Sequence, residues 1–169
     1  MIKIKEINDF LDHLEIEKNY STHTVNAYKT DLNQFFNFTN KKIEEINKSD
    51  ILSFLKYLKE NEYSSTTSNR KLASIKSFYK YLHNEIELID NNLSDKLSNP
   101  KIQKRQPVYL TLHETEILLN TIMKEKNEFL RHRDLAMIFT FLTTGMRLSE
   151  LVSINLADIK GDSFRIIGK

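Results

Sequence analysis

Residues 143–151 of the chain read TTGMRLSEL, and they follow an almost wholly apolar run at 135–142. Gly145 can adopt the left-handed conformation that commonly ends a helix, and a new apolar-spaced turn opens around Glu150. Arg147 therefore lies at a predicted junction of two helices, directly after a segment that we expect to be buried. A guanidinium there is costly unless it is paired or reserved for an anion. The residues leave both uses open: an i,i+3 ion pair with Glu150, or an anion site.

The composition favours a helical protein with a real core. The 169 residues suffice for one ordinary domain, or for a small domain and part of another. A hydrophobic share of 40% argues against disorder, and only 3 glycines and 2 prolines disfavour sandwiches and barrels with many tight turns. The absence of cysteine excludes disulfides and thiolate metal sites and suits the cytoplasm. We find no signal peptide and no 18-residue apolar run, so we expect no membrane association.

The net charge of +2 is small, but the basic residues are clustered. No aspartate or glutamate occurs at 63–84, and this stretch contains the four cations Arg70, Lys71, Lys76 and Lys80. A second basic group falls in the acid-free segment 101–105. Local basic faces of this kind can bind phosphates even when the net charge is low. Each cluster could equally be an ordinary solvated surface.

Apolar spacing predicts four amphipathic helices in the first 85 residues or so, which make a small bundle. They are expected at 4–18, from a Ser21 cap to about residue 38, from Asn47 onward, and from 64–67 onward, with a polar loop at 39–46. On the fourth helix, the predicted core stripe is Leu72, Ile75, Tyr79 and Leu82.

A second face of the fourth predicted helix, away from that stripe, carries cations interleaved with small hydroxyl residues. Such a face can settle close into a DNA groove. The predicted DNA-contacting residues on this face are Thr67, Arg70, Lys71, Ser74 and Ser77. Thr22, at the start of the second helix, is a weaker candidate. Lys104 and Arg105, in the segment after the fourth helix, complete the set. The simpler interpretation is a wet surface.

The pattern lapses at 93–107, which we predict to be a basic linker between a helical bundle at 1–92 and a second lobe at 108–169. A basic linker suits a protein that encloses a duplex between two lobes, because the linker must pass over backbone phosphates. In the second lobe, a capping box opens a helix at 111–114, and 129–142 is expected to be a central, buried helix. A β-type run follows at 163–167, with no evident partner strand.

Residues 144–151 resemble the first catalytic-arginine box of the tyrosine recombinases, the Xer and phage-integrase family. The segments 155–159 and 164–169 match the next segments of that family in order and spacing, and 20–32 looks like the start of its DNA-clamping domain. The resemblance covers the whole chain. It implies a mainly α fold: a four-helix SAM-like core-binding domain, then the first, helical part of the catalytic domain with a terminal β-strand.

The resemblance also implies roles. Arg147 would be the first of two catalytic arginines, and Glu150 would orient the site. Lys169 would be the general acid toward the leaving 5′-hydroxyl, provided that neighbouring cations lower its pKa. The family cuts and rejoins double-stranded DNA through a 3′-phosphotyrosine, with four protomers on two duplexes and with no nucleotide cofactor and no required metal. The simpler interpretations are a surface carboxylate for Glu150 and an ordinary lysine for Lys169.

The family's nucleophile is a tyrosine well downstream of the arginine box. Here every tyrosine precedes Arg147: Tyr20, Tyr28, Tyr57, Tyr63, Tyr79, Tyr81 and Tyr109. The last histidine is His132, so the family's downstream histidine–arginine pair is missing as well. We therefore expect the front part of a longer recombinase, which binds DNA without catalysing cleavage. The alternatives are a non-catalytic DNA-binding protein of the same fold and a helical protein-interaction module.

Overall fold

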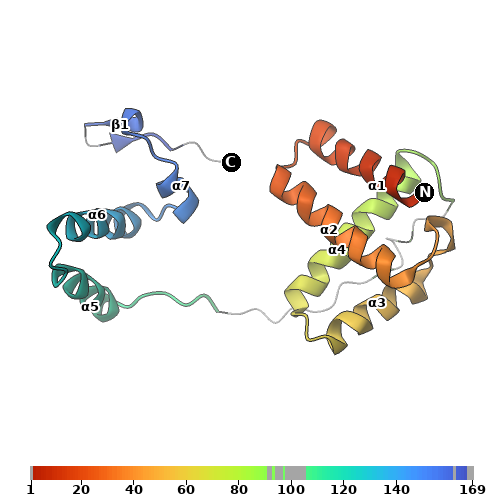
Figure 1. The fold of residues 1–169 in the computed structure, drawn as a ribbon, viewed down its shortest axis with the longest axis horizontal. Coiled ribbons are helices and arrows are strands. Elements are labelled where there is room, and N and C mark those ends of the chain that lie inside the picture. The colour runs from red at the N-terminus through yellow and green to blue at the C-terminus, as the bar shows by residue number, and fades with distance from the viewer. Residues whose placement is uncertain (1, 91–92, 94–96, 98–105, 162, 167–169) are drawn as a thin grey trace. The chain divides into compact units, whose positions relative to one another are not determined.

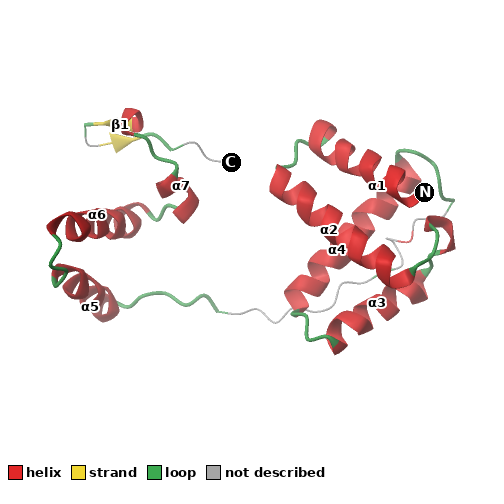
Figure 2. Cartoon of the chain, viewed as in Figure 1, coloured by secondary structure: helices red, strands yellow, loops and turns green. Residues whose placement is uncertain are grey.

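The computed structural model describes residues 2–90, 93, 97, 106–161 and 163–166. The chain divides into two compact units, Met1–Lys104 and Arg105–Lys169. The border between them falls inside the segment 93–107 that the sequence analysis treats as a linker. Helices dominate both units, which agrees with the prediction of a mainly α chain (Figure 2).

Within residues 2–90, unit 1 is a bundle of four helices with two short additions (Figure 1). Its elements are α1 (Ile2–Asp12), the π-helical turn η1 (His13–Glu17), α2 (Thr22–Thr39), the 3-10 turn η2 (Ile43–Glu45), α3 (Lys48–Glu60) and α4 (Ser65–Asn84). The predicted caps are in place, since the Ser21 side chain accepts from the Thr24 amide and Asn47 accepts from Asp50. The first predicted helix differs at its end, where a π-turn replaces the last α-helical turn.

The core of unit 1 lies between α1, α2, α3 and α4. The predicted stripe on α4 is confirmed, because Leu72, Ile75 and Leu82 are fully buried and Tyr79 is 1% exposed. The predicted polar loop at 39–46 is wrong in part, because Ile43 is also buried. The Tyr79 hydroxyl donates to the Ile43 carbonyl at 3.2 Å and so ties η2 to the core.

Unit 2 contains α5 (Leu112–Met123), α6 (Glu128–Thr144), α7 (Leu148–Val152), the 3-10 turn η4 (Leu156–Asp158), and the strands β1 (Ile159–Lys160) and β2 (Ser163–Phe164). The β-type run predicted at 163–167 does have a partner strand: β2 pairs antiparallel with β1, with Ile159 opposite Phe164. The described strand ends at Phe164, and residue 167 lies outside the described residues.

The long helix α6 forms as predicted, but its expected burial is wrong. None of its residues is buried, and Phe129, Phe139 and Leu142 are 74%, 50% and 45% exposed. The physical reason is that α5 packs against one side of α6, whose second half, at 135–142, is apolar nearly all round. The rest of that apolar surface is open to solvent. Among the described residues, no helix is long and apolar enough to cross a membrane.

Candidate nucleic-acid interface and arginine site

The sequence-predicted residues on α4 surround a buried carboxylate from α2. Asp31 is 0% exposed. Its Oδ1 accepts from Lys71 Nζ at 2.9 Å, and its Oδ2 accepts from an Arg70 guanidinium nitrogen at 2.5 Å and from Ser74 Oγ at 2.9 Å. Two cations and a hydroxyl thus compensate a charge that would be costly to bury alone. The cluster joins α2 to α4, the two helices that cross in the middle of unit 1 (Figure 1).

This arrangement corrects the sequence analysis at two residues. Lys71 and Ser74 are 4% and 1% exposed, so they do not lie on a wet face of α4. The exposed position predicted for these two residues was wrong, because the prediction considered the polar residues of α4 without the other helices. Their partner is Asp31, 40 residues before Lys71 and 43 before Ser74, at a core-facing position of α2. The sequence signal for this was an acidic residue next to Leu32, inside the apolar pattern of the second helix.

The other candidates in unit 1 remain accessible. The Arg70 side chain is 48% exposed, although one nitrogen is bound to Asp31. Thr67 and Ser77 are half-buried on α4, and Thr22 is exposed at the first turn of α2. The Thr67 hydroxyl is also hydrogen-bonded to Ser64 Oγ at 2.9 Å, within the cap of α4. The predicted Lys104 and Arg105 lie outside the described residues.

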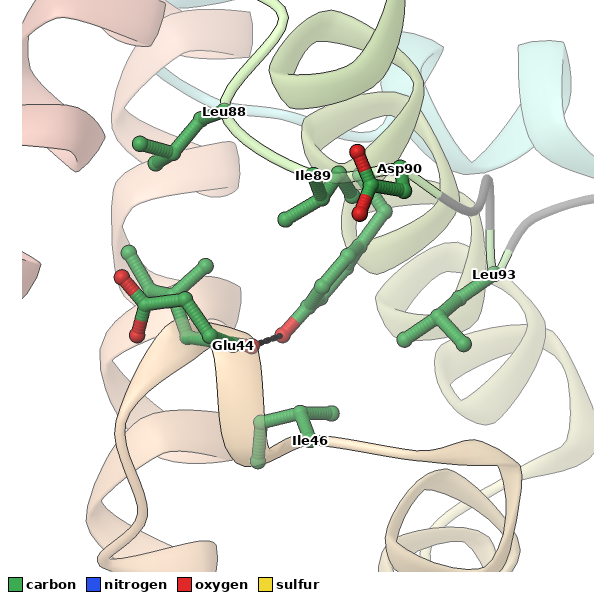
Figure 3. Close-up of a pocket in the computed structure, with 8 residues that line it drawn as sticks. Glu44, Ile46, Leu88, Ile89, Asp90 and Leu93 are labelled. Carbon is green, nitrogen blue, oxygen red and sulfur yellow. Dashed lines mark hydrogen bonds between the residues drawn. The ribbon is translucent and has the colours of Figure 1, made fainter.

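A pocket of about 460 Å³ lies elsewhere in unit 1, between η2 and the segment after α4 (Figure 3). Five of the eight residues that line it are aliphatic, and Glu44 and Asp90 add two carboxylates. Burial and the nearby charges of Asp50 and Glu44 raise the pKa of Tyr79, which also lines it. Two carboxylates beside aliphatic side chains do not suit a phosphate, and no predicted DNA contact among the described residues lines this pocket.

In unit 2, the residues of the arginine box form the predicted junction. Gly145 has φ of +65° and ends α6, with its amide donating to the Phe141 carbonyl at 2.9 Å. Arg147 follows as the N-cap of α7 in an extended conformation. The prediction that a left-handed glycine separates two helices here is confirmed.

Arg147 and Glu150 contact each other twice. The Arg147 amide donates to Glu150 Oε2 at 2.7 Å, and its guanidinium donates to Oε1 at 2.9 Å. The backbone hydrogen bond first, and the side-chain hydrogen bond second, hold the pKa of Glu150 below its usual value. The ion pair weighed in the sequence analysis therefore exists. It does not enclose the arginine, whose side chain is 82% exposed, against 19% for Glu150.

An arginine held in this way can still bind an anion. A guanidinium has five N–H donors in a rigid fork, and the exposure of Arg147 leaves part of that fork open to a phosphate. Its backbone is fixed by the capping box rather than by a flexible loop. Lys169, the predicted general acid, lies outside the described residues. Among the residues that the structure describes, no group of His, Asp or Glu could hold a metal ion.

Comparison with known proteins identifies relatives of this chain. Residues 7–85 match the phage integrase N-terminal SAM-like domain. The chain is 37% identical to tyrosine recombinase XerC of Caldanaerobacter subterraneus subsp. tengcongensis, over 96% of this chain and 52% of that protein. It is 38% identical to XerC of Leptospira interrogans, over 95% and 53%. The chain belongs to the tyrosine recombinase family. It spans about half the length of the curated relatives it matches.

A solved structure shares the fold of this chain. It is that of the Tn1549 transposon integrase in complex with circular intermediate DNA, with a TM-score of 0.67. The match covers 93% of this chain and 51% of that one, at 22% identity. The helical bundle and the helices around the arginine box are therefore the architecture of a known integrase.

Proposed function

We propose that this chain forms the DNA-binding portion and the first catalytic portion of a site-specific recombinase close to the Xer type. The complete enzyme cuts and rejoins duplex DNA in the cytoplasm through a 3′-phosphotyrosine, with no nucleotide cofactor and no required metal. The observation that carries this proposal is the exposed Arg147 guanidinium, fixed by Glu150 at a helix junction in a member of this family.

The chemistry explains why that arginine matters. Strand cleavage needs a nucleophile, cations around the non-bridging phosphate oxygens, and an acid for the departing 5′-oxygen. Arginine suits the second task because its planar fork donates two parallel hydrogen bonds and keeps its charge. Such donors contribute most when they are in place before the transition state forms. Glu150 supplies that placement, and Lys169 is the proposed acid.

Double-stranded DNA is the proposed partner, and the bundle of unit 1 is the part that grips it. The exposed Arg70 and the half-buried Thr67 and Ser77 offer donors along α4, and Thr22 adds a hydroxyl at the start of α2. In the proposed domain plan, residues 1–92 bind the duplex, the linker at 93–107 crosses phosphates with Lys104 and Arg105, and 108–169 begin the catalytic domain. Four protomers would assemble on two duplexes for strand exchange.

A salt titration of the 169-residue chain tests the DNA-binding part of the proposal. Each phosphate contact adds about −0.9 to the slope of log affinity against log salt concentration on a duplex. We expect a slope that corresponds to several contacts, measured by fluorescence anisotropy with a labelled duplex. An affinity that stays flat from low to high salt would contradict the proposal.

A further inference from the structure

We propose that Asp31 is a positioning residue for DNA binding. It holds Arg70 so that the outer edge of the guanidinium meets a backbone phosphate, while Lys71 acts as a counter-charge inside the protein and does not contact DNA. This inference rests on the proposed DNA binding by unit 1. Arg70 and Lys71 are both predicted DNA contacts from the sequence, but in this proposal Arg70 binds DNA and Lys71 is structural.

The charges of the cluster support the division. One carboxylate and two cations leave a single net positive charge in the Asp31 cluster. Lys71 cannot present that charge, because its side chain is 5% exposed and its Nζ lies 5.8 Å from the centre of the Tyr63 ring. The Tyr63 hydroxyl in turn accepts from Gln34 Nε2 at 3.1 Å, which holds the ring in place. The excess charge therefore reaches the surface at Arg70.

The geometry of Arg70 explains why a buried carboxylate is useful there. Only one guanidinium nitrogen is bound to Asp31, and 48% of the side chain is exposed. The planar fork has donors on its other edge, which can bind a phosphate while the inner contact is kept. A charge-assisted bond to a fully buried partner restricts the side chain before DNA arrives. Ordering a long side chain in advance lowers the entropy lost on binding.

The competing explanation is that the cluster only joins α2 to α4. Asp31→Asn alone cannot decide between the two, because it leaves Lys71 as an uncompensated buried cation and threatens folding. The pair variant Asp31→Asn/Lys71→Met avoids this problem. It removes one negative and one positive charge, keeps similar volumes, and leaves Arg70 with its charge but without its carboxylate anchor.

The first measurement is a double-mutant cycle of DNA affinity, in which the full 169-residue chain is titrated against one labelled duplex and followed by fluorescence anisotropy. The four proteins are wild type, Arg70→Ala, the pair variant, and the pair variant with Arg70→Ala added. In the wild-type background we expect Arg70→Ala to weaken binding at least about tenfold, as for a lost charge-assisted hydrogen bond, and to reduce the salt slope by about 1. In the pair-variant background the same change should weaken binding much less. An equal loss in both backgrounds would refute the role of Asp31.

The second measurement needs no DNA. Relaxation of ¹⁵N at the Arg70 Nε–H should show an ordered side chain in the wild type and a mobile one in the pair variant. Equal order in the two proteins would refute positioning by Asp31. An ordered Arg70 in a wild-type chain that binds no duplex would instead refute the proposed function, so the two failures are distinguishable.

Discussion

Arg147 and Glu150 form a structural contact that is compatible with the phosphate binding proposed for Arg147. The carboxylate caps the backbone of α7 with one oxygen and holds the guanidinium with the other. An ion pair and an anion site are therefore compatible here, because the pair orients a side chain that stays exposed. This part of the candidate site was predictable from the sequence, since the motif is local and the partners are three residues apart.

The titration of Glu150 tests this double contact. Its pKa is lowered in the folded chain, so its ionised form stabilises the α7 cap above the usual pKa, and this contribution is lost as the pH falls through the folded value. We expect a carboxyl NMR titration of Glu150 with a midpoint below the usual 4.5. Arg147→Ala should raise the midpoint only part of the way, because the backbone N–H, the larger cause, remains. A wild-type midpoint at or above the usual value would show that the capping box does not form.

At the scale of the element, α4 shows what the sequence could not reveal. Its start, cap and core stripe were predictable, because each depends on residues within one or two turns. The burial of Lys71 and Ser74 was not, because it depends on Asp31, which belongs to another helix. The short turn at Ile43 was missed for the same reason: three residues show no periodicity, and its hydrogen-bonding partner is Tyr79 of α4.

The division of roles on α4 predicts different stabilities for two neighbouring variants. Lys71→Ala removes a buried partner of Asp31 and should cost about 3 kcal/mol of unfolding free energy, near the low end for a broken buried pair because Arg70 remains. Arg70→Ala should cost clearly less, since its side chain is about half exposed. Urea unfolding followed by circular dichroism measures both. Equal losses would indicate that Lys71 is not the buried partner.

The pair variant Asp31→Asn/Lys71→Met is the matched control for that comparison. It should unfold at a urea concentration much closer to the wild type than Lys71→Ala does, because no buried charge is left without a partner. A loss as large as that of the single variant would mean that packing, rather than charge, explains the effect.

At the scale of the whole molecule, the two units differ in how much they bury. Unit 1 encloses a core of fully buried side chains, whereas the described helices α5, α6 and α7 of unit 2 have no buried residues. The helical fold class was predictable from composition and periodicity. The burial of α6 was overestimated, because an apolar sequence shows which surface could be covered but not which neighbours cover it.

This contrast predicts that unit 1 is stable by itself. A fragment of residues 1–104 should melt within about 4 °C of the whole chain, a shift that corresponds to roughly 1 kcal/mol or less for a domain of this size. Thermal unfolding followed at 222 nm provides the comparison. A fragment that melts far below the whole chain would show that unit 2 contributes to the stability of the bundle.

Single-turnover cleavage of a nicked suicide substrate, by a complete recombinase that carries this chain, tests whether Arg147 binds the scissile phosphate. Arg147→Ala should leave folding and site binding nearly intact but slow cleavage at least about 100-fold, the scale of losing one transition-state donor. Arg147→Lys should restore little, because an ammonium lacks the bidentate fork. An Arg147→Ala enzyme that melts normally, binds its site and cleaves at the wild-type rate would contradict the catalytic role of this arginine.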